Sequence, residues 1–329
     1  MQPCQTLPEE DLLTALPQAF RDDLACPVCR DLLEVAADGL VCGNDRCEAK
    51  FATVDGTAIL INPERSLFDV ATFVRKAPTF FKPVGRLRRW ISSSLPTLAA
   101  NVTARGNFRQ FRDQLRGRAE RPRVLVIGGS IVGDGLQVLL GDPGIELLET
   151  DVALGFRTQL ICDAHDLPFR DETFDGVILQ AVLEHVVDPA RCVAEVHRVL
   201  RPGGLVYADT PFMQQVHGRE FDFTRFTRLG HRRLFRRFRE LAAGISGGPG
   251  VALAWSARYF LLSFCRRRWS RAAVSGLSRL AFFWLKYFDY YLVRSPAALD
   301  AASSFYFLGE KSQQTLSDRE LIQSYRGGF

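Results

Sequence analysis

The sequence lacks an apolar run of the ~18 residues that a membrane-spanning helix needs. It also lacks the basic start and apolar stretch of a secretory signal, because its first residues, MQPCQTLPEEDLL, are acidic. We therefore expect a cytoplasmic protein. The 329 residues are 47% hydrophobic and 24% charged, which excludes a disordered chain and suits one large domain or two modest ones.

A disulfide scaffold is also absent, because four of the eight cysteines cluster in one short segment of a long chain. Two residues lie between Cys26 and Cys29, four lie between Cys42 and Cys47, and twelve separate the pairs. Two such pairs supply the four thiolates of a tetrahedral Zn2+ site. No spare ligand is in view, so we expect a structural zinc; free cysteines in a small core are the alternative.

Positive charge is unevenly distributed although the net charge is only +5. Residues 75–123 hold thirteen Lys or Arg against two acids, and further basic blocks lie at 225–239 and 266–268. Such faces are typical of proteins that contact nucleic acid or an anionic membrane surface. Solvated faces that pair with acids elsewhere in the fold are the alternative.

From Arg123 onward, apolar strands alternate with helical segments, which predicts a parallel sheet with helices on both faces. A helix over 188–204 should begin at Asp188 and Pro189 and end at the glycine pair 203–204. Ligands of such sheets lie at the carboxyl ends of the strands, so the polar residues there are candidates. The expected strands lie at or within 123–129, 145–151, 158–163, 174–185, 205–212, 239–248 and 303–312.

The stretch DAHDLPFRDETFDGVILQAVLEHVVDPARCVAEVHRVLRPGG, residues 163–204, resembles the class I S-adenosylmethionine-dependent methyltransferases. The resemblance covers roughly residues 123–241 and a closing strand near SSFYFLGEKS. It implies an α/β fold with a Rossmann-like, mostly parallel sheet of seven strands. The cysteine segment, with the strands of KFATVDGTAILI after it, is similar to the zinc-ribbon proteins that activate tRNA methyltransferases.

The methyltransferase resemblance implies a cofactor site for S-adenosyl-L-methionine. Asp151, which ends the second strand, would accept hydrogen bonds from both ribose hydroxyls, since a vicinal diol offers two donors to one carboxylate. Asp163 would bind the adenine amino group, with Ala164 and His165 along the base edge. Gln180 would lie beneath the methionine portion. The remaining cofactor residues belong to the first loop: Gly128, Gly129, Ser130 and Gly133.

That first loop, in VLVIGGSIVGDGL, departs from the family pattern. Val126 stands where the family usually has an acid, and Ser130 interrupts the expected GxGxG spacing. The missing acid should weaken cofactor binding by ~1.5–3 kcal/mol, the size of one charge-assisted hydrogen bond. Because both carboxylates of the expected site are present, we expect weakened binding and not its loss.

The acceptor should bind beyond the fourth and fifth strands, where the loops are long and charged. His217 is the candidate general base, and His185 is a second candidate whose alternative role is a structural cap. Glu184 is a candidate substrate residue. Asp222 and Arg225 are further candidates, with a mutual ion pair that fixes the loop as the alternative. His197 and His231 should be surface or packed residues.

Fifty residues separate the last two expected strands, and they are helical in pattern, aromatic, and interrupted by an arginine cluster. Such helices suit a peripheral position on the cytosolic face of a membrane, aromatics toward lipid and arginines toward phosphates. Residues 73–90, FVRKAPTFFKPVGRLRRW, have the same character. A cap over the active site or a dimer surface is the alternative.

The favoured function is methylation of a small-molecule, glycan or lipid-linked acceptor. An RNA methyltransferase is the alternative, although no NPPY-type motif for a flipped base follows the fourth strand; a non-catalytic binding protein is a further one. We expect a leader (1–24), a zinc-ribbon module (25–62), a basic helical linker (63–121), a methyltransferase core (122–245), an apolar and basic helical insertion (246–302), a closing strand (303–313) and a tail (314–329).

Overall fold

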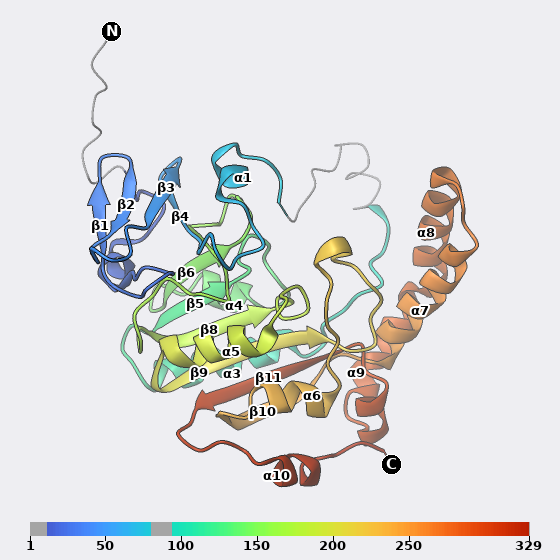
Figure 1. The fold of residues 1–329 in the computed structure, drawn as a ribbon. Helices are drawn as coiled ribbons and strands as arrows, with labels where there is room; N and C mark the ends of the chain where they lie inside the picture. Colours follow the sequence, from blue (N-terminus) through green and yellow to red (C-terminus); the bar gives the residue numbers. More distant parts are fainter. Residues whose placement is uncertain (1–11, 80–93, 329) are drawn as a thin grey trace.

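A sheet of eleven strands runs through residues 12–79 and 94–328, the part of the chain that the computed structural model describes (Figure 1). Its order is β1-β2-β3-β4-β7-β6-β5-β8-β9-β11-β10. The strands are β1 (Leu33–Ala36), β2 (Gly39–Cys42), β3 (Lys50–Val54), β4 (Thr57–Leu60), β5 (Arg123–Ile127), β6 (Glu146–Asp151), β7 (Leu160–Cys162), β8 (Phe174–Gln180), β9 (Leu200–Pro211), β10 (Phe238–Gly247) and β11 (Ser304–Lys311).

The six strands from β4 to β9 in this order pair in parallel. At one end β11 inserts antiparallel between β9 and β10, and at the other β1 to β4 form antiparallel hairpins. The chain leaves β5 first toward β6 and β7 and later toward β8 and β9. The strand order therefore reverses beside β5, and a ligand crevice is expected at the carboxyl ends of these strands.

The cysteine module, residues 25–62, is part of this sheet, so the sheet has eleven strands and not the expected seven. Strand β4 pairs in parallel with β7, with Ala58 opposite Leu160 and Leu60 opposite Cys162. All four residues of β4 are buried. A strand buried on both faces is stable only with neighbours and covering layers on all sides, which explains why it docks beside β7.

Helices cover both faces of the sheet. Helices α3 and α4 pack on one face, and α5 and α6 pack on the other. The helical elements are η2 (Gln18–Asp23), α1 (Val70–Val74), α3 (Ala104–Arg116), α4 (Gln137–Leu140), α5 (Pro189–Val199), η3 (Arg219–Phe221), α6 (Arg228–Leu234), α7 (Pro249–Ser263), α8 (Arg268–Phe282), η4 (Phe283–Phe288), α9 (Asp289–Leu292), η5 (Pro296–Asp300) and α10 (Asp318–Gln323).

Successive side chains of β9 point to opposite faces of the sheet and so contribute to two hydrophobic cores. Tyr207 faces α3, where its ring lies 4.5 Å from the ring of Phe108 and 6.3 Å from that of Phe111. Its neighbours Val206 and Ala208 point to the opposite face and join the core beneath α5. The period of two between buried side chains is that of a strand covered on both sides.

Helix α5 begins as expected and ends earlier. The Asp188 side chain accepts the Arg191 N–H and Pro189 occupies the first turn, but the helix stops at Val199. Leu200 is already extended and opens β9. Pro202 cannot continue a helix, so it favours a stop before the glycines and not at them.

Helices α7 and α8 form a projecting arm, residues 249–282, that extends away from the sheet on the side opposite the cysteine module (Figure 1). Large apolar side chains on the arm face solvent: Phe260 is 65% exposed, Phe264 72% and Trp269 68%. Within the described residues, no helix has both the length and the apolar character to cross a bilayer. Of the basic-aromatic segment 73–90, residues 80–90 lie outside the described part.

Candidate functional site

A pocket opens at the carboxyl ends of β5, β6 and β7, where the strand order reverses. We call it the strand-end pocket. It brings together Asp151, Asp163, Ala164 and His165 with Gly128 of the first loop. Its other lining residues are Leu67, Phe68, Ile127, Val152, Cys162, Val182, His185, Val186 and Val187.

The first loop is tied to the acid that ends β6. The backbone N–H of Ser130 donates to Oδ2 of Asp151 at 3.0 Å. Gly128 has φ +77°, and a side chain there would lie 2.6 Å from Val182 Cγ2. A glycine is therefore required for the loop to pass this closely beneath the pocket. Position 126 is occupied by a buried valine of the α3 core, so strand β5 itself offers the pocket no carboxylate.

Asp151 is buried at the pocket wall. Burial raises the pKa of its carboxyl above the ordinary value, although hydrogen bonds from Ser130, Val152 and Ala153 oppose this. A buried carboxylate gains from further donors, and a ribose diol would supply two. This residue therefore fits the expected ribose contact.

Asp163 is held by two partners. Its Oδ1 accepts the backbone N–H of His165 at 3.0 Å and lies 2.6 Å from the His165 Nδ1, while its Oδ2 accepts the Ser66 hydroxyl at 2.6 Å. Burial raises the pKa of this carboxyl, but the bonds from His165 and Ser66 outweigh it, so the pKa lies below its ordinary value. Asp163 is thus ionised and aligned at the pocket edge.

The segment that leaves the cysteine module forms one wall of the pocket. Ser66 reaches Asp163, and Leu67 and Phe68 line the cavity. The Phe68 ring stacks on that of Phe221, 5.6 Å away, which joins this wall to the loop after β9. Sequence reasoning missed these residues because nothing in the spacing of the chain relates position 66 to position 163.

Gln180 and the two remaining loop positions lie beside the pocket. The Gln180 Nε2 donates to the carbonyl of Asp134 at 3.0 Å, and its Oε1 is buried with no hydrogen-bond partner. Gly133 packs against this amide, and Gly129 packs against Glu149 of β6. The amide of Gln180 thus supports the first loop from below, with one acceptor oxygen still uncommitted.

Glu184, His185 and His217 meet at the acceptor side. Glu184 is fully buried, and neither carboxylate oxygen has a hydrogen-bond partner. The Nε2 atoms of His185 and His217 each lie 3.7 Å from its Oε1. Burial lowers the pKa of His217, but the Glu184 carboxylate outweighs it and raises the pKa above the ordinary value.

Asp222 and Arg225 pair with each other. The Arg225 guanidinium binds both Asp222 oxygens, and Asp222 Oδ2 also accepts the N–H groups of His217 and Gly218 at 2.6 and 2.8 Å. Burial raises the pKa of Asp222, but Arg225 outweighs it and the pKa falls well below the ordinary value. These contacts fix the loop that carries His217.

Asp209, near the end of β9, is a buried acid that sequence reasoning did not select. Asn101 Nδ2 donates to its Oδ2 at 2.6 Å and the Ser246 hydroxyl to its Oδ1 at 2.7 Å. Burial raises the pKa of its carboxyl to about 7, with a contribution from the nearby charge of Glu184. Its position in the sequence could have identified it, because Asp209 is a polar residue near the carboxyl end of a central strand.

The four module cysteines lie together, with all Sγ atoms within 4.8 Å of one another. The Cys26–Cys47 separation is 3.8 Å and the Cys29–Cys42 separation 3.3 Å. A tetrahedral zinc with Zn–S bonds of about 2.3 Å places its sulfurs about 3.8 Å apart. The donor set and spacing therefore fit Zn2+, and they exclude disulfides, whose sulfurs lie about 2.05 Å apart.

The two histidines that were expected to be surface or packed residues are both packed inside the fold. His231 is buried beneath Phe226, Phe235 and Phe307, and burial lowers its pKa to about 3. His197 is buried on α5, with Nε2 3.3 Å from the carbonyl of Ser312. Neither histidine reaches the strand-end pocket.

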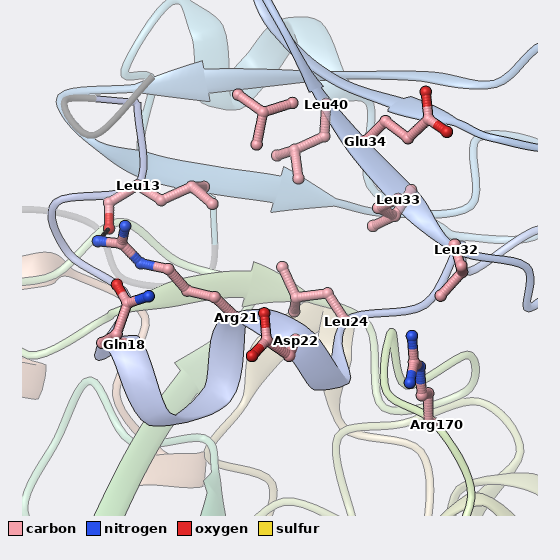
Figure 2. A pocket seen from close by; sticks show the side chains of 11 residues that line it. Leu13, Gln18, Arg21, Asp22, Leu24, Leu32, Leu33, Glu34, Leu40 and Arg170 are labelled. Carbon is pink, nitrogen blue, oxygen red and sulfur yellow. Dashed lines mark hydrogen bonds between the residues drawn. The ribbon is translucent and has the colours of Figure 1, made fainter. Parts of the chain in front are cut away.

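A second hollow lies between η2, which precedes the cysteine module, and the β1–β2 hairpin of that module. Figure 2 shows Arg21 extending from η2 toward Leu13, whose carbonyl accepts its Nη2 at 2.9 Å. Leucines and charged residues line this hollow, and it shares no lining residue with the strand-end pocket. We therefore place the functional site at the strand ends.

Residues 134–208 match a family described as a methyltransferase domain. A segment of 75 residues is 43% identical to an uncharacterised methyltransferase of Mycobacterium tuberculosis, covering 22% of this chain and 30% of that protein. Another of 114 residues is 33% identical to the ubiquinone/menaquinone biosynthesis C-methyltransferase UbiE of Teredinibacter turnerae, covering 30% and 46%. The matched segments thus span less than half of each relative.

Among solved structures, phosphoethanolamine N-methyltransferase 2 of Haemonchus contortus in complex with S-adenosyl-L-methionine aligns with a TM-score of 0.41 and 14% identity, covering 63% of this chain and 53% of that one. The strand order described above is that of a Rossmann-like fold, and residues 134–208, which include strands β6 to β8 of that sheet, are similar to a methyltransferase domain.

Proposed function

We propose that this protein is an S-adenosyl-L-methionine-dependent methyltransferase acting on a small-molecule acceptor. The observation that carries the proposal is the strand-end pocket, in which Asp151 and Asp163 stand at the ends of β6 and β7 within a chain that contains a methyltransferase domain. When bound, the cofactor supplies a methyl group activated by a sulfonium.

Each pocket residue has a defined task in this proposal. Asp151 accepts the ribose hydroxyls, and Asp163, already ionised and aligned by His165, accepts the adenine amino group. Gly128 lets the backbone approach the cofactor closely. Together they hold the methyl group in line with the acceptor, which is the main requirement of this displacement.

The acceptor meets the cofactor near Glu184, His185 and His217. A bound cofactor would offer its methyl carbon to the acceptor's lone pair there, with the sulfur as the leaving group. An oxygen or nitrogen acceptor also loses a proton, and His217 Nε2, placed 3.7 Å from Glu184, is the candidate to accept it.

Calorimetric titration with S-adenosyl-L-methionine tests the proposal. We expect the wild type to bind and Asp151→Ala and Asp163→Ala to bind ten- to a hundredfold more weakly, since each loses a charge-assisted hydrogen bond of ~1.5–3 kcal/mol. Asp171→Ala is the matched control, because Asp171 is an exposed acid paired with Arg198. A wild type that does not bind, or variants that bind equally well, would contradict the proposal.

For the acceptor, we favour a lipid-linked or other small molecule met at a membrane surface. The projecting arm presents exposed aromatic side chains, and Arg266 and Arg267 lie between its helices, next to Arg268 at the start of α8. The basic block 225–239 supports RNA less well, because Arg225, Arg232 and Arg239 pair with acids. Sedimentation with anionic vesicles should carry the protein down; binding to RNA alone would overturn this preference.

A further inference from the structure

The cluster of Glu184, His185 and His217 has the composition of a metal site. One ligand atom from each side chain lies within 4.8 Å of the other two. Glu184 and His185 follow β8, and His217 lies in the loop after β9. Two strand-end loops therefore bring two imidazoles and one carboxylate to one point beside the strand-end pocket, which His185 also lines.

Both imidazole rings are oriented by their other nitrogen. His185 Nδ1 lies 2.7 Å from the carbonyl of Phe221, and His217 Nδ1 lies 3.2 Å from that of Gln215. A ring that donates Nδ1–H to a carbonyl presents an unprotonated Nε2, the form that ligates a metal. The 2.7 Å contact favours this form in His185, whereas His217 Nδ1 also lies 3.4 Å from Arg225 Nη2, which can only donate. The two Nε2 atoms are the ones that face Glu184.

The His185 ring is also clamped by packing. A side chain at position 218 would lie 2.5 Å from the His185 ring, so only glycine allows the loop to lie against it. The loop itself is fixed by Asp222, which accepts two of its N–H groups and neutralises Arg225. The guanidinium nearest the cluster is therefore already paired.

Glu184 supplies the strongest indication of a cation. It is fully buried, and neither carboxylate oxygen has a hydrogen-bond partner in the structure. A buried carboxylate needs positive charge or donors beside it, and the groups that face Glu184 are the two imidazole Nε2 atoms, each 3.7 Å away and beyond hydrogen-bond distance. Two ligands bonded to one ion at about 2.1 Å with tetrahedral geometry lie about 3.4 Å apart, so the observed 3.7 Å needs only a small contraction.

We propose that Glu184, His185 and His217 bind a divalent transition-metal ion such as Zn2+, Mn2+ or Fe2+. Three protein ligands leave coordination positions open. Resting on the proposed function, this ion takes over from His217, whose Nε2 is then a ligand and not a proton acceptor: the ion binds the acceptor oxygen and lowers its pKa, so that the acceptor's proton passes to water. The oxygen lone pair then takes the methyl carbon, and the carbon–sulfur bond pair goes to sulfur.

Mn2+ titration of the full-length protein carrying a single equivalent of Zn2+, which the four thiolates take first, tests the site by electron paramagnetic resonance without S-adenosyl-L-methionine. Mn2+ prefers oxygen and nitrogen ligands to thiolates, so the four cysteines do not compete. We expect one bound Mn2+ in the wild type and at least tenfold weaker binding in Glu184→Gln and His217→Gln. Glu220→Gln, which alters an exposed acid of the same loop, should bind as the wild type does.

His217→Gln keeps the test decisive if the buried Glu184 variant fails to fold, because His217 lies in a surface loop. No bound Mn2+ in a folded wild type, or equal binding in wild type and His217→Gln, would overturn the metal site. Calorimetry of cofactor binding is read separately. A protein that binds S-adenosyl-L-methionine but not Mn2+ overturns the metal site alone. A protein that binds Mn2+ but not S-adenosyl-L-methionine overturns the proposed function.

Discussion

The cysteine module and the projecting arm are both additions to the same sheet, and they are attached in opposite ways. The module joins through backbone: β4 pairs with β7, and Ser66 beyond it binds Asp163 at the strand-end pocket. The arm leaves from β10 and returns to β11, and its aromatic side chains face solvent.

This difference separates two ways of extending a domain. An addition that shares the sheet shares its stability, because its hydrogen bonds and its apolar core are continuous with those of the neighbouring strand. An addition that projects keeps its surface available for another partner. Four predictions sharpen this comparison, from the largest expected effect to the smallest.

Removing one ligand of the expected zinc site should destabilise more than the module itself. Cys47→Ser takes one of four thiolates, and metal binding in such small modules contributes folding free energy on the order of 10 kcal/mol. We expect a loss of several kcal/mol in the free energy of unfolding, with weaker cofactor binding because the pocket wall follows β4. Calorimetric melting measures it against Cys265→Ser, a cysteine of the arm. Equal melting temperatures for Cys47→Ser and Cys265→Ser would mean that the module does not share the stability of the rest of the sheet.

Asp209 ties the root of the arm to the core through Ser246. Its pKa rises from 3.8 to about 7, so the folded protein holds this proton longer than the unfolded chain. The resulting stability is full below about pH 4 and is lost as pH rises through about 7. Asp209→Asn should remove this dependence, changing the stability difference between variant and wild type by about 4 kcal/mol from pH 4 to pH 8.

Urea unfolding of both proteins at several pH values measures the change. Other titrating groups, including buried His231, are common to both proteins, so their contributions cancel in the difference between the two free energies of unfolding. Parallel stability profiles for Asp209→Asn and the wild type would contradict the raised pKa.

Ser66→Ala tests the contact between the module and the pocket. It leaves an oxygen of Asp163 without its hydroxyl partner, so we expect a loss of ~1–3 kcal/mol in unfolding free energy. The pKa of Asp163 should rise, since a bond that favours the ionised form is gone. Urea unfolding and carboxyl titration by NMR measure both, with Ser312→Ala as a remote control. An unchanged pKa of Asp163 would show that the contact is weak.

Replacing Phe260, Phe264 and Trp269 with serine should barely alter folding. These side chains are mostly exposed, so we expect a change within about 0.5 kcal/mol per site. Vesicle sedimentation should nevertheless fall at least tenfold if the arm contacts lipid. Loss of stability without loss of sedimentation would instead favour a packed role for the arm.

Local sequence patterns predicted the central strands well. The strands β5, β6, β10 and β11 lie where the apolar runs place them, and Asp151 and Asp163 share one pocket because parallel strands end at one edge. The early end of α5 is explained by a residue close to it in the chain, Pro202, which cannot continue a helix. These features depend on residues close together in the chain.

The rest depends on contacts between distant segments. The pairing of β4 with β7, which gives eleven strands in place of seven, joins positions a hundred residues apart, and several apolar strands could have competed for that edge. Ser66 and Asp209 escaped selection because their significance lies in their partners, Asp163 in one case and Asn101 with Ser246 in the other. No periodicity encodes such partners.

Because β4 and the core belong to one chain, their association does not depend on the protein concentration. A separate protein supplying the same strand and pocket wall would dissociate on dilution. Here the strand is tethered, and short tethers hold a partner at an effective concentration of about millimolar. The wall formed by Ser66 and Phe68 should therefore stay in place at nanomolar protein, so cofactor affinity should not depend on how much of the protein a cell contains.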